Sequence, residues 1–151
     1  MNLRVGPFDP VLHIRSRDHH RAICREAALL DLPPDSLPRR WEAAVDRFYV
    51  CLQLAPVTEA VDRAFQAGEP AFTADVAVPD EQVPEALAAG NELDRLLGDL
   101  RRWAQESDAD VLSFPDDVRA YYAAFLVQAR AQLQAEATQG AGLPDGALGS
   151  P

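Results

Sequence analysis

One long stretch of the sequence repeats apolar residues at intervals of three and four. The repeat comprises Val83, Leu87, Gly90, Leu93, Leu97, Leu100 and Ala104. Because an α-helix makes one turn in about 3.6 residues, this spacing places the whole repeat on one helix face. Asp80 is a suitable N-cap, and Glu81 would lie in the first turn, where the helix dipole favours negative charge. An apolar face of this length predicts packing against another long helix.

Other segments repeat apolar residues at the same helical spacing. A helix is expected over residues 17–30 after Ser16, and another after Pro115. Between them, residues 35–68 contain Pro56, whose ring removes a backbone hydrogen bond, so this segment is one helix in two halves or two helices at an angle. The apolar faces comprise His20, Ile23, Ala27 and Leu30; Trp41, Val45, Phe48, Leu52, Ala55, Val57, Ala60, Val61, Ala64 and Phe65; and Val118, Tyr122, Phe125, Ala129 and Leu133.

Residues 70–79 carry the strongest strand signal, because β-branched and aromatic residues lie there between flanking prolines. Residues 11–15 alternate apolar and polar side chains and are expected to pair with them, since an isolated strand leaves its backbone groups without hydrogen bonds. Residues 1–10 contain glycine and proline and are expected to be irregular. The sequence thus predicts a mostly α, bundle-like domain of four to five helices with a short two-stranded β pair.

The chain is expected to be a single helical domain over residues 1–138, followed by a disordered tail over 139–151, where Gly, Pro and Ala occur without periodicity. Its net charge is −10, with 24 acidic residues against 14 basic ones, all arginine. This balance argues against binding to nucleic acid and to anionic membranes. The sequence shows no signal peptide and no apolar run that could span a membrane, so a cytoplasmic location is expected.

The sequence contains no motif that indicates a particular enzyme class. Gly-rich phosphate loops, Gly-x-Ser-x-Gly, His-Glu-x-x-His and Cys-x-x-Cys are all missing. We therefore assign no catalytic residue and no cofactor, and expect a protein that is not an enzyme. Cys24 and Cys51 lie on apolar helix faces and are expected to be buried free thiols.

A cluster of polar residues near the start of the chain is the strongest candidate for chemistry. It comprises His13, Asp18, His19, His20 and Cys24. His20 and Cys24 are one helical turn apart and could share a metal ion. No further ligand completes a site at the expected spacing, so we assign no metal and expect these histidines to pack or to face water.

Two Arg-Arg pairs each precede a tryptophan, at Trp41 and at Trp103. Arginine and tryptophan are enriched where proteins bind one another, although arginine also covers aromatic rings at the edge of a core. The candidate partner-binding residues are Trp41, Arg101, Arg102, Trp103, Tyr121 and Tyr122. The sequence therefore favours a non-enzymatic regulatory module that binds another protein.

An alternative function is a helical domain that binds a small ligand or a metal. Its site would be a cavity between helices, floored by His20, Cys24, Phe48 and Tyr49. A further alternative is self-association as a homodimer, in which the leucine face of residues 83–104 would pair between chains.

Several short segments occur in an order that resembles a family of small helical modules. They are residues 12–20, 25–30, 76–79, 92–97, 111–115 and 119–126. The chain resembles a module of actinobacterial regulatory proteins that often lies beside, or is fused to, ATP-binding domains of the anti-sigma-factor serine-kinase type. It departs from the fused form in having no ATP-binding domain in this sequence. The resemblance implies an accessory module in bacterial signalling or transcription control, with an ATP-binding regulator or a sigma factor as its partner and no catalytic residues.

Overall fold

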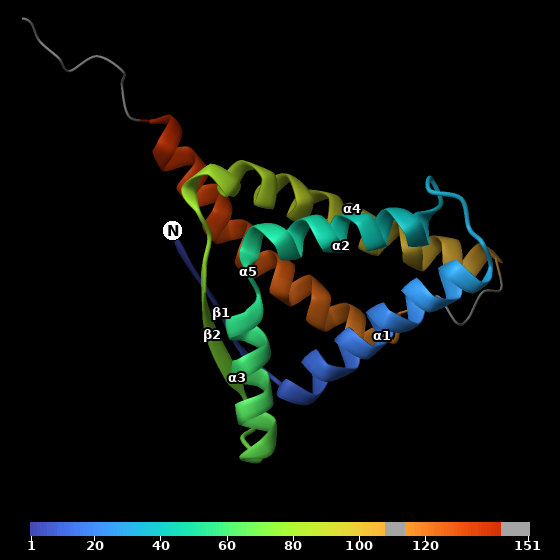
Figure 1. The fold of residues 1–151 in the computed structure, drawn as a ribbon, viewed down its shortest axis with the longest axis horizontal. Coiled ribbons are helices and arrows are strands. Elements are labelled where there is room, and N and C mark those ends of the chain that lie inside the picture. The colour runs from blue at the N-terminus through green and yellow to red at the C-terminus, as the bar shows by residue number, and fades with distance from the viewer. Residues whose placement is uncertain (108–113, 143–151) are drawn as a thin grey trace, which may run out of the picture.

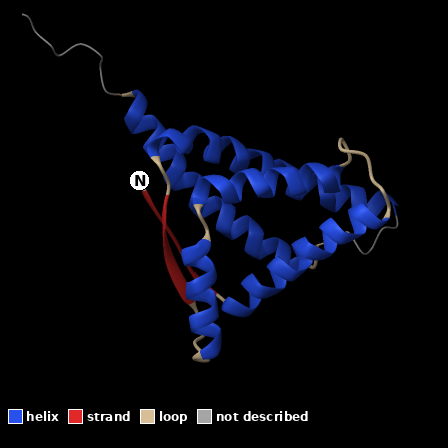
Figure 2. Cartoon of the chain, in the orientation of Figure 1, coloured by secondary structure: helices blue, strands red, loops and turns tan. Residues whose placement is uncertain are grey.

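The computed structural model describes residues 1–107 and 114–142, which form five α-helices and a two-stranded antiparallel sheet (Figures 1 and 2). The mostly α fold with a short β pair is thus as predicted. Residues 108–113 and 143–151 lie outside the described part, and with them most of segment 111–115. In chain order the elements are β1 (Asn2–Phe8), α1 (Pro10–Leu29), α2 (Leu37–Leu52), α3 (Ala55–Gln66), β2 (Phe72–Ala77), a 3₁₀ turn (Asp80–Gln82), α4 (Val83–Ser107) and α5 (Asp116–Ala141).

The long apolar repeat forms helix α4, as predicted, and α4 packs against α2 and α5. Leu93, Leu97 and Leu100 on this face are buried. Because α2 and α5 of the same chain cover these leucines, the face is not available to a second copy. The homodimer that would form through the leucine face is therefore not supported by the fold.

Residues 11–15 are helical, and the prediction of a strand there is wrong. Helix α1 begins at Pro10, and the Asp9 carboxylate caps it by accepting a hydrogen bond from the backbone N–H of Val11 (2.8 Å). Proline is favourable at the first helical position because its missing N–H would have no partner there. The alternation of apolar and polar side chains in 11–15 is therefore part of a helical pattern with a polar inner face.

The strand that pairs with β2 is β1, within the segment that was expected to be irregular. Leu3 pairs with Val76, and Val5 with Ala74, and the side chains of all four residues are buried. The register shifts between Val5 and Phe8, where Gly6 has a φ angle of +109°. Glycine tolerates this backbone conformation. The glycine and proline of this segment therefore produce an irregularity within the strand, and they do not prevent the strand from forming.

Residues 35–68 form two separate helices at an angle, and not one helix in two halves. Helix α2 ends at Leu52, and Gln53 follows in the left-handed region with a φ angle of +47°. Pro56 lies in the first turn of α3, where it costs no hydrogen bond. Figure 1 shows α3 running at a steep angle to α2, so that the two helices form two sides of a triangle that α1 completes.

The last helix continues beyond the predicted domain end at residue 138. Residues 139–141 belong to α5, and the N–H of Gly142 donates a hydrogen bond to the Gln139 carbonyl (3.3 Å). The expected disorder is therefore wrong for these residues, because one glycine at the end of a helix does not prevent its last turn from forming. In residues 1–107 and 114–142, no helix has both the length and the apolarity that a membrane span requires.

Candidate functional site

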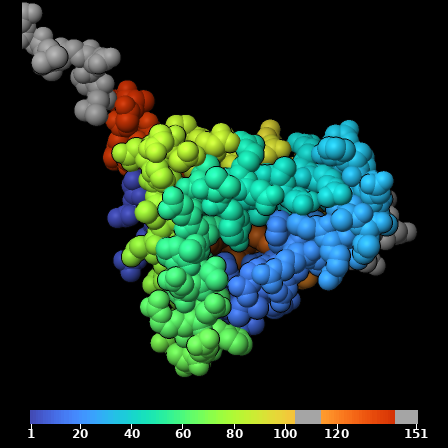
Figure 3. Space-filling view, in the orientation of Figure 1, coloured from blue at the N-terminus to red at the C-terminus, as the bar shows by residue number. Residues whose placement is uncertain are grey.

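Helices α1, α2 and α3 surround a hollow whose floor is α5, which is visible through the opening at the centre of Figure 3. The hollow leads to an interior cavity of about 70 Å³. A water molecule needs only about 10–15 Å³ of such volume, so the cavity is large enough for a group of several heavy atoms. Its walls comprise His13, Ser16, Arg17 and His20 from α1; Trp41, Val45, Phe48 and Tyr49 from α2; Tyr121, Tyr122, Phe125 and Leu126 from α5; and Leu54 and Leu93.

Helical spacing explains why each helix contributes its residues to one wall. On α1, Ser16 and Arg17 follow His13 by three and four positions, and His20 follows His13 by seven, so these residues lie on a single face. That face is polar, whereas the facing stripes of α2 and α5 are mostly apolar or aromatic. A polar stripe that points inward is unusual for a bundle helix, whose inner face is normally apolar. It is the sequence signal that could have revealed the site.

His13 and Tyr121 form a buried polar contact in the cavity wall. The Tyr121 hydroxyl lies 2.5 Å from Nδ1 of His13, and both side chains are buried. Burial, and to a lesser degree the Arg17 guanidinium, lowers the pKa of His13 to about 4. Burial also raises the pKa of Tyr121. Near neutral pH the phenol therefore keeps its proton, and it shares a hydrogen bond with an uncharged imidazole.

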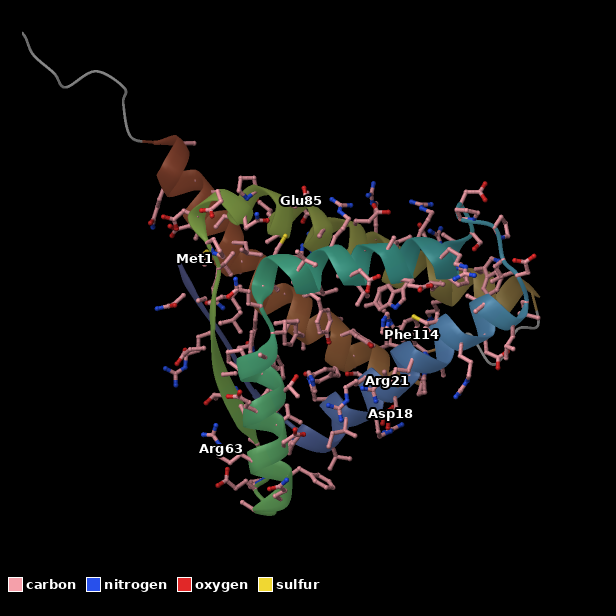
Figure 4. All side chains as sticks on the ribbon, viewed as in Figure 1. Met1, Asp18, Arg21, Arg63, Glu85 and Phe114 are labelled. Carbon is pink, nitrogen blue, oxygen red and sulfur yellow. The ribbon has the colours of Figure 1, made fainter. Side chains whose placement is uncertain are left out.

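Tyr122 connects α5 to α1 beside this contact. Its hydroxyl donates a hydrogen bond to the Ser16 carbonyl (2.7 Å), and the Ser16 hydroxyl donates to the His13 carbonyl (2.7 Å). The Tyr122 ring meets the Trp41 ring edge to face, with centroids 5.3 Å apart. Phe114, labelled in Figure 4, lies between α1 and α2, and its ring contacts that of Trp41 at 5.2 Å. Aromatic packing thus holds this end of the cavity in place.

Trp41, His20 and Cys24 form a second chain of polar contacts. The Trp41 indole N–H donates to Nδ1 of His20 (3.2 Å), and Nε2 of His20 lies 3.5 Å from the Cys24 sulfur. Because Nδ1 accepts, Nε2 carries the proton and points it at the sulfur. Burial, together with the smaller effects of the Glu42 and Asp46 carboxylates, raises the pKa of Cys24 to about 11, so the thiol stays protonated. This pair is therefore not an activated thiolate.

No group of three His, Cys, Asp or Glu side chains that could hold a metal ion exists among residues whose positions are described. His20 and Cys24 do come together, but without a third ligand from that part of the chain. Both cysteines are free thiols; Cys51 is buried as expected, and Cys24 is half-buried.

Arg17 is the charged residue of the cavity wall. The two histidines beside it have lowered pKa values, since burial disfavours their charged forms. The Nε atom of Arg17 is buried and has no hydrogen-bond partner in the described structure. A buried donor without a partner costs free energy, so a group that accepts from Arg17 would be bound favourably.

The cavity opens to solvent through a wider depression of about 510 Å³. The two share residues from α1 and α2, among them Arg17 and Tyr49. Arg21 and Asp46 lie farther out in the depression. Arg21 is 3.8 Å from Asp18, one turn earlier on α1, and both residues are labelled in Figure 4. Arg17 therefore stands at the boundary between the apolar interior and the open mouth.

The predicted partner-binding residues divide into two separated groups. Trp41 and Tyr121 are 0% and 5% exposed and, with half-buried Tyr122, belong to the cavity wall. The prediction that Trp41 and Tyr121 lie on a docking surface is therefore wrong, because aromatic stripes at helical spacing face the core. Arg101 and Arg102 are exposed, and half-buried Trp103 follows them.

The alternative prediction of a cavity was more accurate about position. His20, Phe48 and Tyr49 line the observed cavity or its mouth, whereas Cys24 contacts His20 without reaching the wall. Sequence reasoning missed Arg17, Ser16 and the wall from α5. Helices α1 and α5 are far apart in the sequence, and nothing local in either segment indicates that they meet.

No family model, curated protein or solved structure matches this chain. The resemblance to the actinobacterial accessory modules therefore stays a prediction.

Proposed function

We propose that this chain is a small-ligand-binding helical domain whose ligand occupies the cavity between α1, α2 and α5. The observation that carries the proposal is the cavity itself, about 70 Å³ beside the hydrophobic core. Protein interiors normally contain few voids larger than a water molecule. At about 24 cal/mol per Å³, leaving this volume empty would cost on the order of 2 kcal/mol of stability. A ligand that fills the volume would offset that cost.

The composition of the wall also favours ligand binding. Binding pockets are mostly apolar and aromatic, with a few polar groups that fix orientation. Here the phenol of Tyr121, the phenol of Tyr122 and the indole of Trp41 already have hydrogen-bond partners within the chain. The wall is thus arranged before a ligand arrives, which reduces the entropy cost of binding.

The wall favours binding over catalysis. An imidazole with a pKa near 4 is a weak base at neutral pH, and general bases work best with a pKa near the operating pH. The Cys24 thiol and the Tyr121 phenol keep their protons at neutral pH, because burial raises the pKa of both groups. We therefore propose no catalytic residue.

A cavity-filling variant tests the proposal. Val45 is buried and lines both the cavity and its mouth, so Val45→Phe should fill the space. Titration of ¹⁵N-labelled protein with small apolar compounds of four to eight heavy atoms should shift signals of cavity residues in the wild type. In Val45→Phe the affinity should fall at least tenfold, while the melting temperature is kept or raised.

Val127→Phe is the matched control, because Val127 is 61% exposed on α5 and adding a ring there leaves the cavity unchanged. Its affinity should equal that of the wild type. Binding that survives in Val45→Phe, or signal shifts confined to the far side of the molecule, would show that the cavity is not the site.

A protein-binding role beside an ATP-binding regulator, as the resemblance implies, is a second proposal. Arg101 and Arg102 are exposed, and a shallow depression lined by Leu37, Arg102 and Trp103 adjoins them. Replacing Arg101 and Arg102 together by Glu should weaken binding to a purified anti-sigma-type kinase at least tenfold. Arg63→Glu is the control and should have no effect, because Arg63 is at an exposed position of α3 at the opposite end of the molecule in Figure 4. Equal binding by both variants would contradict this role.

A further inference from the structure

We infer that the ligand of the cavity is a small apolar monocarboxylate, whose carboxylate pairs with Arg17 at the mouth and whose short apolar end enters the interior. This inference rests on the proposed function and adds the chemical class of the ligand. It follows from where charge is placed along the path from solvent to the cavity floor.

The interior of the cavity accepts an uncharged group. Its wall combines apolar side chains such as Phe125 and Leu126, which do not line the mouth, with the neutral His13–Tyr121 pair. The volume of about 70 Å³ is roughly half of a cavity of 150 Å³ that binds benzene, so it suits a branched end of a few carbon atoms. A charged group placed there would lose its hydration without gaining an opposite charge.

The boundary between cavity and mouth provides the positive charge. Arg17 lines both spaces, and its buried Nε has no partner among the described residues. It forms no ion pair with any residue in the described ranges 1–107 and 114–142, whereas Arg21 beside it has Asp18 within 3.8 Å. A guanidinium binds a carboxylate through two parallel hydrogen bonds, and such charge-assisted bonds are about twice as strong as neutral ones. A carboxylate in the mouth would therefore provide the ion-pair partner that Arg17 does not have among the described residues.

The same surroundings favour one negative charge over two. Asp46 lies in the mouth with Arg17, and the whole chain carries a net charge of −10. A dianion such as a phosphate monoester would meet repulsion from both and would find a single unpaired guanidinium. A monocarboxylate matches that single charge.

A matched pair of probes tests the inference: 3-methylbutanoate and its neutral amide, 3-methylbutanamide, which have the same shape. Both should shift the Trp41 indole signal of ¹⁵N-labelled full-length protein, and the acid should bind at least tenfold more tightly. Arg17→Met, which keeps the aliphatic part of the side chain, should bring the affinity for the acid down to that for the amide. Arg17→Lys should retain part of the preference.

Arg25→Gln is the control, because Arg25 is exposed on α1 and lines neither the cavity nor its mouth. It should change the acid-to-amide preference by less than twofold. An unchanged Trp41 indole signal in free Arg17→Met shows that the variant is folded. If wild-type protein binds acid and amide equally, or if Arg17→Met keeps the preference, the ligand class is wrong while the proposed binding function stands. Tighter binding of inorganic phosphate than of the acid would also overturn the class. If neither organic probe binds, the inference and the proposed function both fail.

Discussion

His13 shows how burial controls charge at a single residue of the cavity. Desolvation, and to a lesser degree the Arg17 guanidinium, lowers its pKa from 6.5 to about 4 against the smaller opposing effect of Asp62 on α3. The Tyr121 hydroxyl is then hydrogen-bonded to an imidazole that carries no charge. The His13–Tyr121 pair in the cavity wall is therefore neutral at physiological pH, and its imidazole acquires a positive charge only in acid.

The lowered pKa of His13 predicts a loss of stability in acid. In the unfolded chain the imidazole takes up a proton near pH 6.5, but in the folded chain only near pH 4, so the unfolded state binds more protons between these values. The free energy of unfolding should thus fall as pH decreases through this window, by about 2 kcal/mol from this residue at pH 5. Urea unfolding at pH 7 and at pH 5 measures the difference.

His13→Gln isolates this contribution from those of His19, His20 and the carboxylates. Its side-chain oxygen can still accept from the Tyr121 hydroxyl, but it does not titrate. The loss of stability between pH 7 and pH 5 should be about 2 kcal/mol smaller in the variant than in the wild type. An equal loss in both proteins would mean that His13 is not held in its neutral form.

At the scale of elements, the step in strand β1 depends on a single glycine. Gly6 has a φ angle of +109°, and a Cβ atom there would lie 2.5 Å from the Phe72 carbonyl oxygen on β2. Gly6→Ala should therefore destabilise the fold by about 2 kcal/mol or more, because the backbone of β1 or β2 must move. Urea unfolding would detect the shift.

Gly98→Ala is the matched control for this substitution. Gly98 lies within α4 and, apart from its chain neighbours and the adjacent backbone of its own helix, no described atom is within 4 Å of the position that its Cβ would occupy. Alanine there should stabilise the helix by about 0.5–1 kcal/mol. A Gly6→Ala protein as stable as the wild type would contradict the close contact between β1 and β2.

The sequence predicted those elements whose apolar periodicity is evident within their own segment. The leucine repeat of α4 and the aromatic stripe of α5 are helical by periodicity alone, and both were predicted. The start of α1 was missed because His13 interrupts an apolar pattern, although Asp9 and Pro10 are a suitable cap and first residue. Strand β1 was missed because Gly6 and Pro7 normally break strands.

The candidate site required information that no single segment contains. His20, Phe48 and Tyr49 could be named as cavity residues because each lies on an expected inner face. Arg17 could not, since an arginine on a helix is normally solvated. Its role depends on Tyr49 of α2 and Tyr121 of α5, which pack near it only in the folded chain.

At the scale of the whole molecule, the cavity follows from the arrangement of the helices. Helices α2 and α4 pack side by side along their length, but α3 turns away from α2 at Gln53, and α1 closes the triangle from the other side. Because these three helices cross at large angles, they diverge and leave a space between them. Side chains from α5 fill most of it, and the remaining volume is the proposed binding site.

The central claim is that this volume is a preformed apolar cavity that a ligand can enter, and xenon tests it most directly. Xenon is uncharged and binds apolar cavities without hydrogen bonds, so its binding depends on neither Arg17 nor His13. Spectra of ¹⁵N-labelled protein under a few atmospheres of xenon should show shifts that saturate and are confined to residues around the cavity, such as Val45, Phe48 and Phe125. Val45→Phe should abolish them. Shifts that are absent, or spread evenly over the molecule, would contradict the claim.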